Sequence, residues 1–318
     1  MRNTILRKKM QVTDTLLMVR PNRFYMNSET AVNNYFQKNT HVGKDKINAS
    51  AQREFDGFVS VLRERNIQVI VVEDTSEQNT PDSIFPNNWV SFHENGTVAL
   101  YPMYAENRRV ERKLDIWKSL KDADFQIDDI KDYSQAENTG QFLEGTGSMV
   151  LDRENKRAYC ALSDRADREL FEKFCHDFGY MPVSFVANQT VGKKRMPIYH
   201  TNVMMCIATT FAIICLESID DREEREHVVD QLRKTGKHII PISEEQVGHF
   251  AGNMLQVKNT LDYEYLVMSS TAARSLSPRQ IINIQKHCDI IHSELGTIET
   301  CGGGSARCMM AEIFLQKK

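Results

Sequence analysis

The sequence predicts an α/β fold in which five ββαβ repeats close into a ring, a five-bladed α/β propeller with pseudo-fivefold symmetry. Four segments each begin with small or polar residues, continue into apolar stretches of β type, and end in a charged, helix-like stretch. Such regular repetition is typical of architectures in which neighbouring units complete one another's core. The four segments are residues 86–121, 145–179, 200–236 and 252–288.

A fifth repeat is divided between the two ends of the chain. Residues 302–315 resemble the openings of the other repeats but have no helix after them, whereas residues 15–21 and 28–37 look like a strand and a helix without an opening strand. The regular spacing predicts one domain over residues 1–318, with the polar opening residues gathered at a common axis. Markers at the five openings, 53 to 56 residues apart, are Asn88, Glu144, His200, Asn253 and Cys308.

Composition excludes several function classes. The chain has 40 Lys and Arg residues against 43 Asp and Glu, a formal net charge of -3, and no long run of one sign, so we expect no nucleic-acid partner. No apolar region of a secretory signal follows the basic start, and the apolar stretch around residues 211–216 is too short to cross a bilayer. Seven cysteines without a CxxC pair indicate reduced thiols. We therefore expect a cytoplasmic protein without a membrane partner.

Three marker positions carry side chains suited to attack on a carbon–nitrogen bond. Cys308 follows the glycines at 302–304, which let the backbone approach a substrate, and the neighbouring Arg307 offers a positive charge that favours a thiolate. His200 is suited to support that thiolate and to protonate a leaving amine. Glu144 is suited to fix the imidazole tautomer and orient a water molecule. Each residue alone is compatible with a structural role, and their shared position in the repeat favours the chemical one.

The other motifs predict neither a cofactor nor a metal site. The glycines at 145–147 and 302–304 lack the residues that complete a dinucleotide fingerprint or a phosphate loop. The remaining histidines are scattered without an HExxH pair. Cys301, the alternative nucleophile, precedes the glycine run, and we interpret it as structural.

The order and spacing of Glu144, His200 and Cys308 resemble the guanidino-group-modifying, or pentein, superfamily, which includes arginine deiminase, agmatine deiminase, dimethylarginine dimethylaminohydrolase and the amidinotransferases. GGGSARC resembles the nucleophile segment of that superfamily, LEGTG its acidic strand start, and HTN its His-x-Asp element. The resemblance covers the chain from about Thr15 onward. It implies a five-bladed pentein propeller, a single amidinotransferase/deiminase-like catalytic domain and a small amino-acid substrate.

The resemblance also implies which residues hold the substrate. DSIFPNN resembles the DxxFxED stretch of the dimethylarginine hydrolases, which places Asp82 at the substrate α-amino group. ALSDRAD resembles the LSxRT element, so Arg165 would bind the α-carboxylate through two parallel hydrogen bonds. Arg108 is similar to the second carboxylate-binding arginine, with the adjacent Arg109 as the alternative.

Departures from the family pattern indicate an uncharged substrate. Asn87 and Asn88 stand where the dimethylarginine hydrolases have two acids, and Asn202 stands where arginine deiminase has an aspartate two residues after its histidine. Carboxylates pair with a cationic guanidinium but face the carbonyl oxygen of a urea with unbalanced charge, whereas an amide offers both a donor and an acceptor. The predicted substrate is therefore citrulline, hydrolysed to ornithine, carbon dioxide and ammonia, as in the citrulline ureidases of this superfamily.

Three other functions fit the same pattern. An arginine deiminase or methylarginine hydrolase would act on a guanidinium held by acids elsewhere in the chain. An amidinotransferase would need an incoming amine, and a non-catalytic binding ring, as in a ribosome-associated translation factor of this architecture, would need no activated thiol. The sequence does not determine which C–N bond breaks first, and it leaves a homo-oligomer open.

Overall fold

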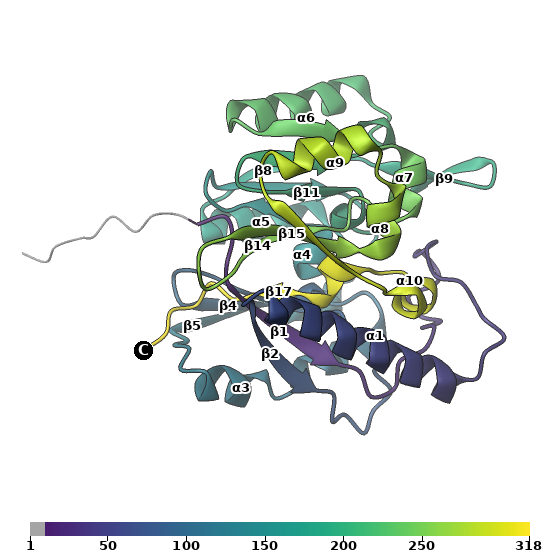
Figure 1. Ribbon diagram of the computed structural model, residues 1–318, viewed down its shortest axis with the longest axis vertical. Helices are drawn as coiled ribbons and strands as arrows, with labels where there is room; N and C mark the ends of the chain where they lie inside the picture. Colours follow the sequence, from purple (N-terminus) through teal and green to yellow (C-terminus); the bar gives the residue numbers. More distant parts are fainter. Residues whose placement is uncertain (1–9) are drawn as a thin grey trace, which may run out of the picture.

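The computed structural model describes residues 10–318 and contains, within that range, five three-stranded sheets whose strands are connected in the same way (Figure 1). In each of them the first strand pairs antiparallel with the second, and the second pairs parallel with the third. This is the ββαβ order of the predicted repeats, and the mixed α/β fold is confirmed. The sheets are β17 (Ala311–Glu312), β1 (Thr15–Arg20) and β2 (Gln68–Glu73); β3 (Val90–Phe92), β4 (Thr97–Leu100) and β5 (Asp129–Asp132); β6 (Val150–Asp152), β7 (Arg157–Ala161) and β8 (Met181–Phe185); β11 (Met205–Ile207), β12 (Phe211–Ile214) and β13 (His238–Pro241); and β14 (Leu255–Lys258), β15 (Glu264–Ser269) and β16 (Asp289–Ser293).

Helices connect the second and third strands of the sheets, and α1, α3 and α6 lie at the periphery of the molecule (Figure 1). Local sequence explains where they begin. In α5, for example, the Asp167 side chain accepts a hydrogen bond from the Leu170 backbone, and Gly179 ends the helix with a left-handed conformation. The connections are α1 (Lys44–Glu64), α2 (Glu106–Arg109) with α3 (Ile116–Asp122), α5 (Arg168–Phe178), α6 (Arg222–Lys234), and α8 (Ser270–Ser275) with α9 (Pro278–Gln285).

Shorter elements lie between and beside the repeats. The β9–β10 hairpin projects from the body of the molecule (Figure 1). A short helix, α10, leads from β16 toward the last repeat opening. These elements are the hairpin β9 (Asn188–Val191) and β10 (Lys194–Pro197), the helices α7 (Glu244–Gly248) and α10 (Gly296–Gly302), and the 3₁₀ turns η2 (Val110–Lys113), η3 (Ser134–Thr139) and η5 (Leu216–Ser218).

The two ends of the chain share one sheet, as the divided fifth repeat predicts. Strand β1 pairs antiparallel with β17, with Leu16 opposite Glu312, and parallel with β2. In Figure 1 the purple β1 and the yellow β17 lie side by side, although they stand at opposite ends of the sequence. The C-terminal segment therefore receives its position from the first strand of the chain.

Two helix predictions are wrong in their bounds. Residues 28–37 form turns, and the helix of this repeat is α1, which begins at Lys44. Polar side chains of the turn segment bond to distant residues, with Asn27 donating to Asp82 and Asn34 to the Gly302 carbonyl. These contacts take the place of helical hydrogen bonds. The predicted helix in residues 106–121 is also divided, into α2, η2 and α3.

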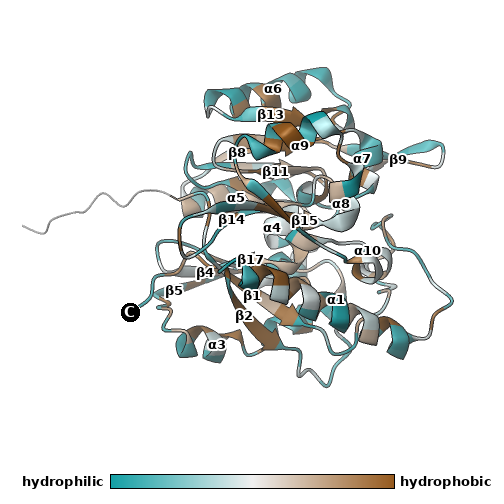
Figure 2. Ribbon diagram, in the orientation of Figure 1, coloured by the Kyte–Doolittle hydropathy of each residue, from teal (hydrophilic) through white to brown (hydrophobic). Residues whose placement is uncertain are grey.

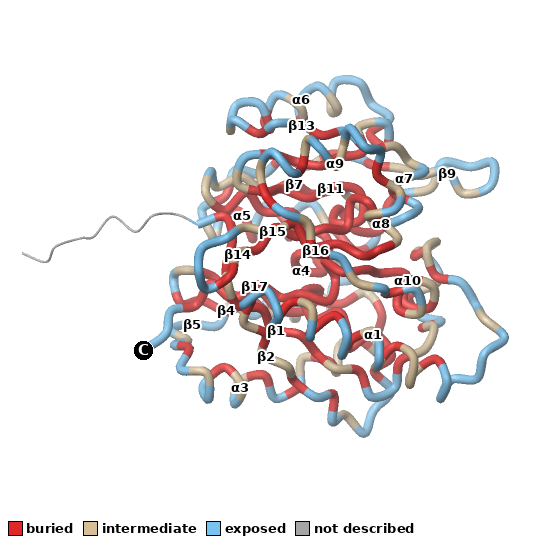
Figure 3. Tube along the Cα trace, viewed as in Figure 1, coloured by how far each residue is buried: buried red, intermediate tan, exposed pale blue. Residues whose placement is uncertain are grey.

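Four of the repeat openings are short helical turns that precede the first strand. The turn α4 packs against both η1 and η4, and η1 also packs against η6. The residues of these turns are buried although several are polar, and the centre of the molecule is accordingly buried in Figure 3. In Figure 2 the outer helices show hydrophilic surfaces, whereas inner strands are more hydrophobic. The turns are η1 (Pro86–Asn88), α4 (Gly145–Ser148), η4 (Thr201–Val203) and η6 (Ala306–Met309).

Two further predictions concern targeting and redox state. Residues 1–9, on which the predicted lack of a secretory signal rests, lie outside the described residues. From residue 10 onward, no helix combines the length and the apolar character needed to cross a bilayer. All seven cysteines lie within the described part of the chain and are free thiols, as their spacing predicts.

Candidate active site

Two amide side chains surround the Cys308 sulfur. Asn253 Nδ2 lies 3.2 Å from Cys308 Sγ, and Asn202 Nδ2 lies 3.6 Å from it. Asn253 Nδ2 also lies 3.0 Å from the Asn202 backbone oxygen, and Asn253 Oδ1 accepts from the Arg307 backbone N–H, so the Asn253 amide is held in place. Burial raises the pKa of the Cys308 thiol, although the Asn253 hydrogen bond opposes the rise. The resting sulfur is therefore a protonated thiol.

A carboxylate and an imidazole form the second part of the site. Glu144 Oε2 lies 2.8 Å from His200 Nε2, and both side chains are buried. Burial lowers the pKa of His200 to about 4, although Glu144 favours its charged form. Burial alone would raise the pKa of Glu144, but Arg165 and the His200 hydrogen bond bring it down to about 2. At neutral pH the pair therefore consists of an ionised carboxylate and a neutral imidazole that donates from Nε2, which leaves Nδ1 as a proton acceptor.

Two further groups fix the Glu144 carboxylate. Its Oε1 accepts from the Tyr104 backbone N–H at 2.9 Å, and its Oε2 lies 3.5 Å from Arg165 Nη1. Arg165 in turn lies over the Tyr199 ring, 4.9 Å from the ring centre. The carboxylate can therefore orient His200 without moving itself.

Asn88 and Arg108 form a buried polar cluster beside this pair. Arg108 Nη1 donates to Asn88 Oδ1 at 2.7 Å, and Arg108 Nε and Nη2 donate to the two Glu111 oxygens at 2.9 Å. Asn88 Nδ2 donates to Asn87 Oδ1 at 3.1 Å, which leaves one of its hydrogens for another acceptor. Arg109 points elsewhere: its guanidinium donates to the Met103 and Tyr104 carbonyls and is partly exposed. Of the two arginines, Arg108 faces the predicted site.

Asp82 is a buried carboxylate with one oxygen satisfied and one without a partner. Its Oδ2 accepts from Asn27 Nδ2 at 2.8 Å and from Thr30 Oγ1 at 3.1 Å, whereas Oδ1 has no hydrogen bond among the described residues. Burial raises the pKa of Asp82, although Arg108 opposes the rise. A positively charged group beside Oδ1 would satisfy this carboxylate.

Gly147 allows Asn88 and His200 to approach the same point. A Cβ atom at position 147 would lie 2.5 Å from Asn88 Nδ2 and 2.8 Å from His200 Nδ1, both closer than real Cβ contacts. Only glycine therefore leaves this space clear at position 147. Thr146, the residue before it, contacts the amides on either side: its hydroxyl lies 3.3 Å from Asn87 Nδ2, and its carbonyl accepts from Asn202 Nδ2.

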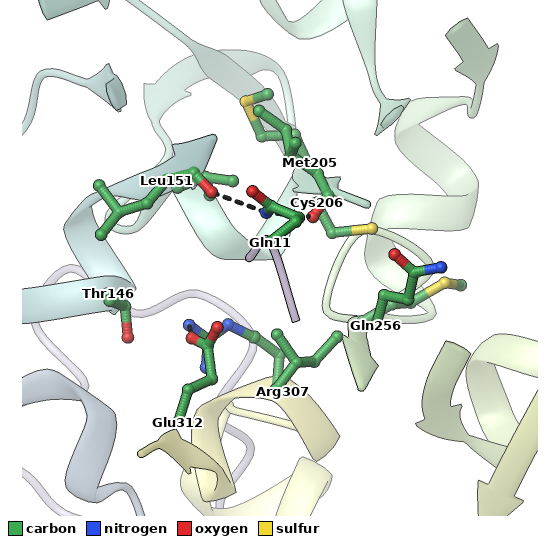
Figure 4. A pocket seen from close by; sticks show the side chains of 12 residues that line it. Gln11, Thr146, Leu151, Met205, Cys206, Gln256, Arg307 and Glu312 are labelled. Carbon is green, nitrogen blue, oxygen red and sulfur yellow. Dashed lines mark hydrogen bonds and ion pairs between the residues drawn. The ribbon is translucent and has the colours of Figure 1, made fainter. Parts of the chain in front are cut away.

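The Arg307 guanidinium donates its hydrogen bonds away from the thiol, although its charge lowers the pKa of Cys308 as the sequence suggests. Its Nη2 pairs with Glu312 at 2.7 Å, and its Nη1 donates to the Met310 carbonyl. The Arg307 and Glu312 side chains, together with Gln11 and Thr146, line a small cavity of about 20 Å³, large enough for about one water molecule (Figure 4). The predicted site residues are absent from its lining. This arginine thus pairs with Glu312 and acts on the sulfur through its charge, without a hydrogen bond to it.

Some contacts in the site were missed by the sequence analysis. Asn253 was used only as a repeat marker, yet it is the nearest donor to the sulfur. The turn segment around Asn27, Thr30 and Asn33, interpreted as a helix, contacts Asp82 and Arg165. The repeat register could have indicated Asn253, but local sequence gave no signal for the turn segment because its partners Asp82 and Arg165 lie 52 to 135 residues away. Within residues 10–318, no cluster of three or more His, Cys, Asp or Glu side chains could hold a metal ion.

Comparison with known proteins identifies one matching family model. Residues 20–315 match the model described as N,N dimethylarginine dimethylhydrolase, eukaryotic. A comparison with curated protein sequences finds no match.

Solved structures with a similar fold include two named enzymes. One is ArgZ, an arginine dihydrolase from the ornithine-ammonia cycle in cyanobacteria, with a TM-score of 0.72 and 16% identity over 94% of this chain and 40% of that one. The substrate-bound N-terminal domain of ArgZ gives a TM-score of 0.70 at 15% identity, covering 94% of this chain and 97% of that one. A dimethylarginine dimethylaminohydrolase in an adduct with S-methyl-L-thiocitrulline gives 0.63 at 14% identity, covering 95% and 100%. This chain therefore spans 40% of full-length ArgZ, and the similarities show a shared fold.

Proposed function

Because the chain belongs to the eukaryotic N,N-dimethylarginine dimethylhydrolase family, we propose that it is a cysteine-dependent hydrolase of the ureido group of citrulline, producing ornithine, carbon dioxide and ammonia. The family is one of pentein-superfamily hydrolases that act on C–N bonds of guanidino compounds. The proposal therefore concerns the substrate and the residues that act on it.

The neutral surroundings of the nucleophile carry the proposal. The side chains in hydrogen-bond contact with Cys308 Sγ are the amides of Asn202 and Asn253, with no carboxylate among them in the described residues. A cationic guanidinium beside this sulfur would need a carboxylate from outside this group of contacts to balance its charge. An uncharged urea needs none, since amide groups match its C=O and N–H groups.

The proposed reaction begins with two neutral groups. The Cys308 thiol passes its proton to His200 Nδ1 as its sulfur adds to the ureido carbon, and the resulting imidazolium is stabilised by Glu144. His200 then returns the proton to the departing nitrogen. This leaves a thiocarbamate on Cys308, carrying either the NH₂ group or the ornithine nitrogen. Water activated by His200 hydrolyses the thiocarbamate, and the carbamic acid released loses carbon dioxide.

The remaining predicted residues hold the amino-acid part of the substrate. Asp82 has an oxygen without a partner that suits an α-ammonium group, and we assign it that role. Arg165 is the proposed partner of the α-carboxylate. Arg108 already has the Glu111 carboxylate and the Asn88 amide as partners, so we assign it to positioning Asn88 rather than to direct carboxylate binding. Asn88, through its remaining hydrogen, and Asn202 are the proposed partners of the ureido group, with Asn87 holding Asn88 in place.

The closed ring is part of the same proposal. Strand β17 packs on β3, β6 on β11, and β11 on β14, so the first strands of successive sheets are neighbours. A five-bladed arrangement over the whole chain as one catalytic domain accounts for these contacts. It also explains why residues from all five repeat openings are connected by hydrogen bonds.

A second candidate substrate is a guanidinium compound, either arginine or a methylarginine. The family description and the ArgZ similarity favour it, since both name enzymes of guanidino amino acids. The buried carboxylates Glu144 and Asp82 would then have to balance the guanidinium charge as well as serve His200 and the α-amino group. Because each carboxylate would then have two roles, we propose citrulline rather than a guanidinium compound as the substrate.

Product stoichiometry tests the proposal. Purified protein is incubated with citrulline, arginine, agmatine and methylarginine, and ammonia, ornithine and citrulline are quantified. Citrulline hydrolysis gives one ornithine per ammonia, an arginine dihydrolase gives two ammonia per ornithine, and a deiminase gives citrulline without ornithine. Adding glycine exposes amidino transfer. Ornithine and ammonia in equal amounts from citrulline, with slow or no turnover of arginine, is the expected result, and inert citrulline would reject the proposal.

A further inference from the structure

Buried polar atoms without partners are concentrated beside the proposed amino-acid clamp. Within residues 10–318, most of them belong to two segments, residues 33–40 and residues 82–83. Two have opposite hydrogen-bonding character. Asn33 Nδ2 is a donor without an acceptor, and Asp82 Oδ1 is an acceptor without a donor. Leaving such groups unpaired costs free energy, so their persistence indicates a function.

Arg165 and Thr30 connect these two atoms. Arg165 Nε donates to Asn33 Oδ1 at 2.9 Å, and Arg165 Nη2 donates to the Thr30 carbonyl at 2.8 Å. The Thr30 hydroxyl donates to Asp82 Oδ2 at 3.1 Å. The unpaired donor and the unpaired acceptor therefore belong to one hydrogen-bonded network, which reaches Glu144 and His200 through Arg165 Nη1.

An α-amino acid in its zwitterionic form complements this network. Its carboxylate accepts hydrogen bonds, and its ammonium group donates them. A carboxylate oxygen at Asn33 Nδ2 would lie near the Arg165 charge, and an ammonium group at Asp82 Oδ1 would neutralise a carboxylate for which burial is unfavourable. Both unpaired groups would be satisfied by the same ligand.

We propose that Asn33 is a substrate-binding residue that donates from Nδ2 to the α-carboxylate of the amino-acid substrate while its Oδ1 holds Arg165 in position. The inference rests on the proposed function only in that the substrate is an α-amino acid, whether its far end is a ureido or a guanidino group. The turn at residues 28–37 thereby becomes part of the active site.

Substitution by aspartate separates the two roles of this amide. Asn33→Asp retains an oxygen that accepts from Arg165 and removes the Nδ2 donor. A residue that only holds Arg165 would tolerate this change, because a carboxylate accepts from a guanidinium at least as well as an amide does. A residue that donates to the substrate carboxylate would not, because it would then present a negative charge to a negative charge.

Binding is measured by calorimetry in the Cys308→Ala protein, which cannot form the covalent intermediate. The ligands are L-citrulline and L-arginine, each paired with the analogue that lacks only the α-carboxylate, N-carbamoylputrescine or agmatine. Asn39→Asp, on an exposed side chain of the same segment, is the matched control for the added charge. Asn33→Ala provides a second variant, and thermal unfolding confirms that each variant is folded.

Asn33→Asp and Asn33→Ala should each weaken binding of the preferred amino acid at least ~10-fold, with Asn33→Asp the weaker binder, because a hydrogen bond to a charged group is lost. Binding of the decarboxylated analogue and binding by Asn39→Asp should change less than ~2-fold. Undiminished amino-acid binding by Asn33→Asp, or equal losses for the amino acid and its analogue, would overturn the inference. A preference for arginine would reject citrulline as the substrate without affecting Asn33, whereas binding of neither amino acid would reject both.

Discussion

The two halves of the proposed active site differ in charge. Around His200, the neighbouring groups are the ionised Glu144 and the Arg165 guanidinium, both almost fully buried. Around Cys308, the neighbouring side chains are the amides of Asn202 and Asn253. The half around His200 contains charged groups held in ion pairs, whereas the half around Cys308 contains neutral hydrogen-bond donors and acceptors.

This difference suggests separate roles for the two halves in the proposed reaction. The charged half holds the imidazole in one tautomer and keeps it neutral, because burial lowers the pKa of His200 to about 4. In the neutral half the proposed nucleophile is a thiol, because burial raises the pKa of Cys308. In the mechanism we propose, the sulfur is therefore activated when its proton moves to His200 during attack rather than by a permanent negative charge. A substrate without charge at its reacting end fits the neutral half.

Cys308→Ala should produce the largest effect. Removing the sulfur eliminates the covalent intermediate, so turnover should fall by at least ~10⁴-fold while the fold is retained. Cys301→Ala, a change at a buried cysteine in the same segment, is the control and should retain turnover within a few-fold. Steady-state ammonia release measures both. Activity that survives in Cys308→Ala, or disappears only in Cys301→Ala, would reassign the nucleophile.

Glu144→Gln should be the next most damaging change. The glutamine amide would place a donor against His200 Nε2–H and favour the other tautomer, in which Nδ1 carries a hydrogen and cannot accept the thiol proton. The loss of kcat should be on the order of 10²- to 10⁴-fold, with substrate binding less affected. Pre-steady-state and steady-state kinetics with citrulline separate the two. A variant within 10-fold of the wild-type kcat would contradict the assigned role.

The charged half should also make the protein acid-sensitive. The pKa of His200 is about 4 in the folded protein against 6.5 ordinarily, so the unfolded chain binds a proton that the folded protein does not as pH falls from 6.5 to 4. Stability should fall across that window by on the order of 3 kcal/mol from this residue, since the two pKa values differ by about 2.5 and each pKa unit corresponds to about 1.4 kcal/mol. Glu144, with a pKa of about 2 against 4.5, adds a further loss below pH 4.5.

Urea unfolding at pH 7 and pH 4.5 measures the His200 contribution. The difference in stability between the two pH values should be smaller in His200→Gln than in wild type by about the amount given, because glutamine does not titrate. An equal pH dependence in the two proteins would show that His200 is not a buried neutral imidazole.

Asn88→Asp should weaken citrulline turnover more modestly, by about 1 to 3 kcal/mol in kcat/KM, because a carboxylate beside the ureido oxygen leaves that oxygen badly paired. Arg108, which donates to Asn88 Oδ1, would accommodate the new charge and so preserve the fold. Asn95→Asp, on an exposed side chain of the same repeat, is the control. Citrulline kinetics that match the wild type would remove Asn88 from the ureido site.

Much of this site could be predicted from the repeat pattern. The order of polar openings, with His200 one repeat after Glu144 and Cys308 two repeats after His200, locates three residues that are all buried in the structure. The sharing of one sheet by β1 and β17 also followed from the incomplete repeats at the two ends. Periodicity predicts these features because each repeat buries its opening against its neighbours.

Other features depend on contacts that periodicity does not encode. The turn at residues 28–37 has a helix-like composition, but its polar side chains bond to Asp82, Arg165 and the glycine run instead. Arg307 stands next to the nucleophile in sequence, yet its side chain turns to Glu312 because neighbouring residues in a turn point in different directions. Tyr104 contributes only its backbone N–H to Glu144, which no side-chain motif can reveal.

The most direct test of an uncharged substrate is the ratio of kcat/KM for citrulline to that for arginine, measured in wild type and in Asn88→Asp/Asn202→Asp. We expect a ratio far above one in wild type and a shift toward arginine in the double variant, since carboxylates would replace amides at the reacting group. A wild-type ratio below one, unchanged by the two substitutions, would contradict it.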